Sequence, residues 1–145
     1  MLIAVRFDGE PCTLDRQCRI YRAKGTGHRS LRTLVVEAIR QAGIEYSREL
    51  AELAVSETGM GRVEDKITKN LSQARHTPGV ECLSPKVLSG DHGLTLIENA
   101  AWGVIASVTP STNPAATIIN NAISMVAAGN AVVFAPHPAA KKVSQ

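Results

Sequence analysis

The amino-acid sequence predicts an α/β fold in which N-terminal helices precede a single βαβ unit. Three observations predict it. Apolar residues recur at helical spacing between residues 30 and 76. Val104–Val108 is a continuous, largely β-branched run, which is typical of a parallel strand buried on both faces. An apolar helical stretch and a second apolar strand, Ala131–Phe134, follow this run directly.

The helical region over residues 30–76 divides into two or three segments. Gly43 is expected to interrupt the first segment, because glycine weakens a helix. The second segment stops at Gly59, a residue suited to a C-terminal cap. In the third, Asp65 stands four residues before Lys69, so these two side chains are expected to pair on the outer face.

The βαβ unit begins after an alternating stretch that starts at Leu94 and predicts extended backbone. The loop Thr109–Pro114 joins the first strand to a helix over residues 115–128. After the second strand, the loop that begins at Ala135 is expected to lead into another helix. One such unit cannot close a doubly wound sheet, because its strands need neighbours on both sides. The fold is therefore expected to be incomplete.

Residues 1–28 differ from residues 29–145, which form the predicted domain. They contain two of the three cysteines and several arginines, and they show no strong hydrophobic period. Met1–Phe7 is compatible with a short strand. We treat this segment as an atypical N-terminal extension.

Composition excludes several classes of protein. Hydrophobic residues make up 44% of the chain and charged residues 20%, as in a globular protein rather than a disordered one. The net charge of +3 is scattered, so nucleic acid is not an expected partner. No apolar run approaches the roughly 20 residues of a membrane span. Three irregularly spaced cysteines predict neither disulfides nor a metal site but reduced thiols in a cytoplasm.

The first candidate site is the loop Thr109–Pro114. It follows a buried strand, so it lies at the carboxyl edge of the sheet, where α/β folds bind ligands. Thr112 and Asn113 stand immediately before Pro114, a favourable first helical residue. Free N–H groups and the helix dipole favour an anion or an oxyanion here. The alternative, on equal terms from the residues alone, is that Thr112 or Asn113 is simply an N-cap.

The second candidate site is the loop that contains Ala135, Pro136 and His137, after the next strand. Parallel strands end at the same edge of a sheet, so a nucleotide could lie across both loops. The plainer alternative is a proline-rich turn with a solvent-facing histidine. The sequence contains no glycine-rich phosphate-binding motif after a strand.

Four long stretches carry a resemblance to a known family. The chain from about Ser30 to Gln145 resembles the CoA-acylating acetaldehyde and propionaldehyde dehydrogenases of bacterial ethanolamine and propanediol utilisation, with the ethanolamine branch nearer. This covers roughly four fifths of the chain. The stretches that carry the resemblance are Glu49–Arg62, Thr77–Pro85, Val108–Pro114 and Val133–Lys141.

The resemblance implies the Rossmann-like NAD-binding domain of the aldehyde dehydrogenase superfamily, with NAD as cofactor and coenzyme A as a substrate. The implied reaction converts an aldehyde, CoA and NAD to an acyl-CoA and NADH, in a homo-oligomer located in the cytoplasm or a bacterial microcompartment. Thr112 or Asn113 would contribute to the oxyanion site. The residues implied as cofactor-binding are Thr109, Pro110, Ser111, Ala135, Pro136 and His137.

Two departures from the family pattern qualify this expectation. Residues 1–28 do not resemble the N-terminus of these enzymes, and the nucleophilic cysteine of the family would lie beyond Gln145. None of Cys12, Cys18 or Cys82 matches it. The 145-residue chain is therefore expected to be inactive alone. The alternative function is a non-catalytic interaction module that associates with full-length subunits or with a microcompartment shell.

Overall fold

The computed structural model describes residues 29–145, so the strand expected at Met1–Phe7 lies outside the described residues. Three long helices come first, a β-hairpin follows, and a βαβ unit ends the chain. The elements in order are α2 (Arg29–Glu45), α3 (Ser47–Thr58), α4 (Val63–His76), η1 (Val80–Cys82), β1 (Lys86–Gly90), β2 (Gly93–Ile97), β3 (Val104–Thr109), α5 (Pro114–Ala127), β4 (Ala131–Pro136) and η2 (Pro138–Ala140).

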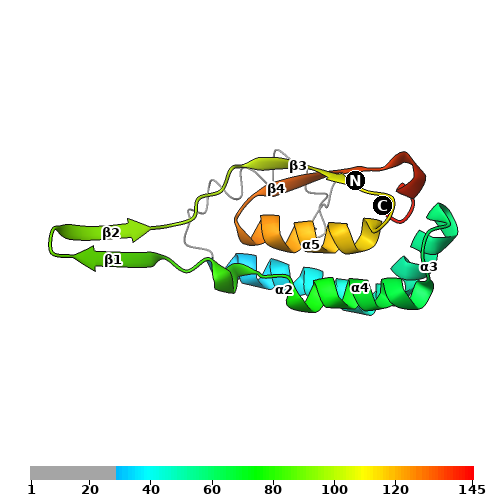
Figure 1. Ribbon diagram of the computed structural model, residues 1–145, viewed down its shortest axis with the longest axis horizontal. Helices are drawn as coiled ribbons and strands as arrows, with labels where there is room; N and C mark the ends of the chain where they lie inside the picture. Colours follow the sequence, from blue (N-terminus) through cyan, green and yellow to red (C-terminus); the bar gives the residue numbers. More distant parts are fainter. Residues whose placement is uncertain (1–28) are drawn as a thin grey trace.

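The body of the molecule has three layers (Figure 1). Strands β3 and β4 pair in parallel, and α5 crosses between them, which confirms the predicted βαβ unit. One side of α5 faces this pair of strands, and α2 and α4 lie against its other side. A helix enclosed on two sides must be apolar around most of its circumference, and that is the composition of α5.

The core consists of apolar side chains on both sides of α5. Between α5 and the helices, Ile119 and Ile123 pack with Val36 and Ala74. Between α5 and the strands, Ile118 packs with residues of β4 that include Phe134. Each such side chain contributes about 1.5–3 kcal/mol when fully buried. None of the helices within residues 29–145 has the length and apolarity needed to cross a membrane.

Gly43 does not interrupt the first helix, so that prediction is wrong. Helix α2 continues through Gly43 to Glu45. A β-carbon at Gly43 would lie 3.2 Å from the Ala74 Cβ and 3.3 Å from the Ile119 Cδ1, closer than ordinary packing. The glycine thus lets α2 approach α4 and α5, and this packing outweighs its poor helix propensity. Gly59 ends α3 in the left-handed conformation with φ of 66°, as predicted.

Strand β3 is covered on one face only, which corrects the expectation of burial on both. Ser107 and Thr109 are buried on the side of α5, whereas the alternate residues are exposed, and Val108 is 79% exposed. No element among the described residues covers the outer face of β3. Strand β3 thus has the apolar composition of a central strand, but no second layer of helices covers it within residues 29–145.

The hairpin of β1 and β2 extends away from the three layers (Figure 1). Its strands pair antiparallel from Lys86 opposite Ile97 to Gly90 opposite Gly93. The extended backbone predicted from Leu94 is confirmed, but its partner β1 was not predicted. All ten strand residues are exposed, including large apolar side chains such as Leu88, Leu94 and Leu96.

Candidate functional site

The two candidate loops meet at one edge of the strand pair. In the parallel register, Thr109 at the end of β3 lies opposite Pro136 at the end of β4. The His137 backbone N–H donates a 3.2 Å hydrogen bond to the Thr109 carbonyl oxygen, which extends the pairing by one bond beyond the strand end. Thr109 and Pro136, which are 27 positions apart in the sequence, thus lie side by side at one edge, as the topology predicts.

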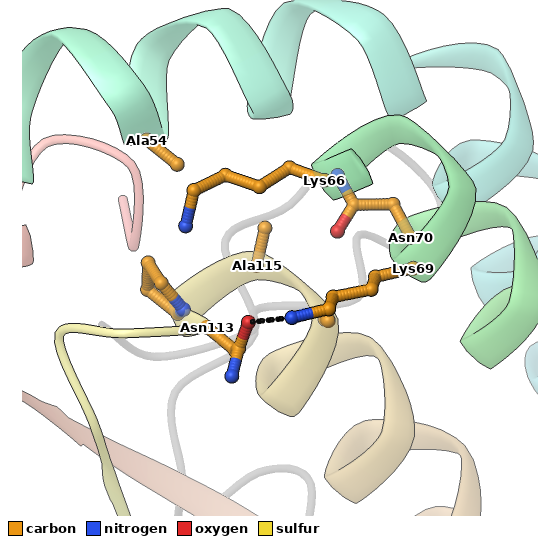
Figure 2. A pocket seen from close by; sticks show the side chains of 8 residues that line it. Ala54, Lys66, Lys69, Asn70, Asn113 and Ala115 are labelled. Carbon is orange, nitrogen blue, oxygen red and sulfur yellow. Dashed lines mark hydrogen bonds between the residues drawn. The ribbon is translucent and has the colours of Figure 1, made fainter. Parts of the chain in front are cut away.

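Two lysines of α4 donate hydrogen bonds to the first loop. The Lys66 Nζ donates a 2.7 Å hydrogen bond to the Thr112 carbonyl oxygen, and the Lys69 Nζ donates a 3.1 Å bond to the Asn113 Oδ1. Figure 2 shows both ammonium groups pointing from α4 toward the beginning of α5. The loop is therefore attached to a helix that is more than 40 residues away in the sequence.

The predicted pair of Asp65 and Lys69 does not form. Asp65 instead accepts a 2.8 Å hydrogen bond from the Nε of Arg62, three residues earlier at the start of α4. Lys69 is left to bind Asn113. The spacing of four residues allowed the predicted pair, but the amide of Asn113, supplied by tertiary structure, competes for the same ammonium.

Lys66 is buried, with a relative exposure of only 6%. This burial lowers the pKa of its ammonium, and the neighbouring positive charge of Lys69 lowers it further. Gly61, with φ of 77°, lies over the side chain, since a β-carbon there would approach the Lys66 Cε to 3.3 Å. The ammonium therefore has little room to leave the Thr112 carbonyl.

Asn113 occupies the N-cap position of α5 without capping the helix through its side chain. Its φ of −139° and ψ of 58° are non-helical, and no side-chain capping hydrogen bond forms within the described residues. Its carbonyl oxygen accepts the first helical bond from the Thr117 N–H at 3.1 Å, and Pro114 follows as the first helical residue. Because a lysine ammonium only donates, the atom that faces Lys69 is the amide oxygen, and the amide NH₂ is left to donate elsewhere.

The remaining residues of the first loop differ in exposure. Pro110 and Thr112 are exposed, and Ser111 is half-buried. Thr109 is 1% exposed, and its hydroxyl has no hydrogen-bond partner among residues 29–145. By contrast, the Ser107 hydroxyl on the same face of β3 accepts a 2.9 Å bond from the Asn121 Nδ2. A buried hydroxyl without a partner is rare and costs free energy, so Thr109 marks this strand end as unusual.

The second loop is more open. Ala135 and His137 are exposed, and Pro136 is half-buried. The Nδ1 of His137 accepts the N–H of Ala139 at 3.1 Å and so caps η2. Along the segment that was expected to lead into another helix, the chain forms the single turn of η2 and a following turn.

Glu57 at the end of α3 anchors the segment after η2. Its carboxylate accepts hydrogen bonds from the backbone N–H groups of Lys142 at 2.8 Å and Val143 at 2.9 Å. The bond from Lys142 is the main cause that lowers the pKa of Glu57. This carboxylate therefore fixes the chain that leaves the second loop against α3.

Sequence reasoning missed Lys66, Lys69 and Glu57. For Lys66 a signal was present: it shares a helix face with Asn70 and Ala74, at spacings of four residues, and that face is buried. A lysine at a core position of an amphipathic helix indicates a specific partner. Lys69 and Glu57 lie on exposed or half-exposed positions, where charged residues are ordinary.

Cys82 lies far from both loops. It is exposed in η1, and Val80 of the same turn packs with Ile123 and Ala127, toward the end of α5 opposite Asn113. The 14 residues of α5 span about 21 Å. Within residues 29–145 no group of three or more histidine, cysteine or acidic side chains is arranged to hold a metal ion.

No protein-family model matches the chain. A curated relative, the acetaldehyde dehydrogenase (acetylating) EutE of Salmonella typhimurium, is 78% identical over 116 residues, which are 80% of this chain and 25% of that enzyme. The chain thus spans about a quarter of the length of the curated relatives to which it is more than three quarters identical.

Solved structures of propionaldehyde dehydrogenases are also similar to this chain. A propionaldehyde dehydrogenase from the fucose utilisation microcompartment of Clostridium phytofermentans superposes with a TM-score of 0.82 and 45% identity, over 90% of this chain and 30% of that one. The propionaldehyde dehydrogenase of Rhodopseudomonas palustris, with bound propionyl-CoA, gives a TM-score of 0.80 and 41% identity, over 91% of this chain and 30% of that one.

Proposed function

This chain belongs, over four fifths of its length, to the CoA-acylating aldehyde dehydrogenases, and from that membership we propose that it is part of an enzyme that converts an aldehyde, CoA and NAD to an acyl-CoA and NADH. Acetaldehyde is the proposed substrate, because the relative that is 78% identical is an acetaldehyde dehydrogenase, whereas the propanal dehydrogenase of Salmonella typhimurium is 53% identical. The cytoplasm or a bacterial microcompartment is the proposed location, the latter because one structural relative comes from such a compartment.

The observation that carries the proposed role of the site is the orientation of the Asn113 amide. Lys69 binds its oxygen, so the NH₂ group is the part that can donate to an oxyanion. Thr112 is exposed, and no hydrogen bond from another residue of the described segment 29–145 orients its hydroxyl in this way. We therefore assign the oxyanion role to Asn113 rather than to Thr112.

The edge formed by Thr109 and Pro136 is suited to a nicotinamide cofactor. It lies at the carboxyl ends of parallel strands. The buried Thr109 hydroxyl has no hydrogen-bond partner within residues 29–145, and a bound group could supply one. When bound, NAD supplies a hydride acceptor. Thr109, Pro110 and Ser111 would hold it from one loop, with Ala135, Pro136 and His137 on the other loop.

The test of this function is a chimera in which residues 30–145 of this chain replace the homologous segment of the Salmonella typhimurium acetaldehyde dehydrogenase. We expect CoA-dependent NAD reduction with acetaldehyde. The change Asn113→Ala should lower kcat by roughly 10²–10³-fold, the usual effect of losing one oxyanion donor. Thr112→Ala is the matched control and should retain kcat. A chimera that folds but shows no turnover would contradict the proposed function, and the reverse order of the two variants would contradict the assignment.

A second candidate function is association with full-length subunits of such an enzyme or with a microcompartment shell. It is favoured by the hairpin of β1 and β2, whose exposed Leu88, Leu94 and Leu96 form no part of the core. The test is size-exclusion chromatography of the 145-residue chain with the Salmonella enzyme. Co-elution that is lost in a variant with Leu94→Ser and Leu96→Ser would support association, and separate elution would exclude it.

A further inference from the structure

Lys66 fixes the direction of one peptide group in the first loop. Its ammonium binds the Thr112 carbonyl oxygen at 2.7 Å from the side of α4. In a trans peptide the carbonyl and the following N–H point in opposite directions, and the described chain contains no cis peptide. Binding the Thr112 carbonyl toward α4 therefore turns the Asn113 N–H away from α4.

Lys69 fixes the side chain of the same residue. It binds the Asn113 Oδ1 at 3.1 Å, so it selects one of the two orientations of the amide and leaves the NH₂ group pointing away from Lys69 (Figure 2). The two lysines, three residues apart on α4, thus act on the main chain and the side chain of Asn113 together. Their positive charges also increase the polarity of the amide whose oxygen Lys69 binds.

A purely stabilising role accounts poorly for Lys66. Burial disfavours its charged form, which lowers its pKa, and the charge of Lys69 adds repulsion. Thr112 as a residue is exposed, and only its bond to the lysine is partly buried. Gly61 in the turn between α3 and α4 packs against the Lys66 side chain and confines it. A buried and confined ammonium on a solvent-accessible loop is suited to orienting that loop.

We infer that Lys66 and Lys69 are positioning residues that present the Asn113 amide to the oxyanion of the reacting aldehyde. The catalytic part of this inference, that Asn113 donates to an oxyanion, rests on the proposed function. The structural part, that the two lysines orient Asn113, does not. Neither lysine touches the substrate in this arrangement. Each acts through the first loop, Lys66 through the Thr112 carbonyl and Lys69 through the Asn113 amide oxygen.

The structural test uses hydrogen exchange in the full 145-residue chain. Thr117 donates its N–H to the Asn113 carbonyl and reports on the loop, while Leu50, which donates to Tyr46 in α3, is the internal control. Lys66→Met should accelerate exchange at Thr117 about five- to tenfold, the effect of one lost hydrogen bond, and leave Leu50 unchanged. Equal exchange at Thr117 in both proteins would overturn the inference. Lys69 is exposed, so Lys69→Met should fold normally. This variant should increase the exchange rate at Thr117 by a smaller factor. It therefore tests the inference even if Lys66→Met does not fold.

The catalytic test uses the chimera described above. Lys66→Met and Lys69→Met should each lower kcat about 10–100-fold with little change in KM, as expected when a donor is displaced rather than removed. Lys66→Arg, which retains a donor, should recover part of kcat.

A double-mutant cycle separates positioning from a general structural effect. If Lys66 acts through Asn113, the combination of Lys66→Met with Asn113→Ala should be no slower than Asn113→Ala alone. Multiplicative losses would overturn the inference. An inactive parent chimera would overturn the proposed function and the catalytic purpose of the lysines together, whereas an active chimera with unaffected lysine variants would overturn only the positioning role.

Discussion

The guanidinium of Arg40 on α2 donates a 2.6 Å hydrogen bond to the Thr77 carbonyl oxygen, just beyond the end of α4. The same side chain donates a 2.8 Å bond to the Ala74 carbonyl oxygen and lies 3.6 Å from the carboxylate of Glu81. A helix leaves its last carbonyls without intrahelical partners, and a cation there also complements the helix dipole. Thr77 binds the Gln73 carbonyl locally, and Arg40 supplies from α2 the donors for the Ala74 and Thr77 carbonyls.

Removing these donors should destabilise the fold. We expect Arg40→Met to lower the free energy of unfolding by about 1–3 kcal/mol, because two carbonyl oxygens in a partly buried region lose a charged donor. Urea denaturation followed by circular dichroism measures the change. Arg48→Met is the control: its pairs with Glu52 and Glu64, both at 3.7 Å, are exposed and should contribute less than about 1 kcal/mol. Equal losses in the two variants would contradict the capping role.

Packing rather than helix propensity should decide the effect of substitution at Gly43. Leucine is a better helix former than glycine, yet Gly43→Leu should lower the free energy of unfolding by about 1–3 kcal/mol. The added side chain would collide with Ala74 and Ile119. Ala42→Leu, at the adjacent exposed position of α2, should be neutral within about 0.5 kcal/mol. Stabilisation by Gly43→Leu would show that the three helices do not pack as closely as described.

Two hydroxyls on one face of β3 should respond oppositely to removal. Ser107→Ala deletes the acceptor of the Asn121 amide and should cost about 1 kcal/mol or more. Thr109→Val removes a buried hydroxyl without a partner among the described residues, so stability should stay equal or rise. In the chimera, the same Thr109→Val change should weaken NAD binding, measured by fluorescence titration. Destabilisation by Thr109→Val would mean that its hydroxyl already has a partner.

Glu57 should make stability depend on pH in the acidic range. Its folded-state pKa is lowered from the ordinary value of 4.5, chiefly by the Lys142 N–H, so the stabilisation is present above that value and is lost as the pH falls through the folded pKa. Glu57→Gln should lower the melting temperature at neutral pH, and the two melting curves should converge in acid. Glu45→Gln, on an exposed position of α2, is the control and should leave the difference near zero at both pH values.

Local features predicted the elements well where the signal lies within a few residues. Gly59 ends α3 because a left-handed C-cap needs a residue without a β-carbon, and Pro114 begins α5 because its ring favours the first helical position. The β-branched run before Thr109 became a parallel strand for the same local reason. The hairpin strand Lys86–Gly90 escaped prediction, since its five residues show no regular alternation of apolar and polar side chains.

The candidate site was predicted in its position but not in its chemistry. A strand followed by a loop and a proline-initiated helix placed Thr109–Pro114 at a sheet edge, and the next strand brought Ala135–His137 beside it. The choice between Thr112 and Asn113 stayed open from the residues alone. It is the contact of Lys69, 44 positions away in the sequence, that orients the amide of Asn113.

The sequence by itself determined the order of helices and strands and the βαβ connection, because capping, periodicity and β-branched runs act between near neighbours. Only the tertiary structure decided that Gly43 continues a helix, that one face of β3 is covered, and that Lys66 binds the Thr112 carbonyl. Each of these depends on contacts between elements remote in the chain. The free energy of such contacts exceeds a local propensity of about 1 kcal/mol, so local pattern alone could not specify them.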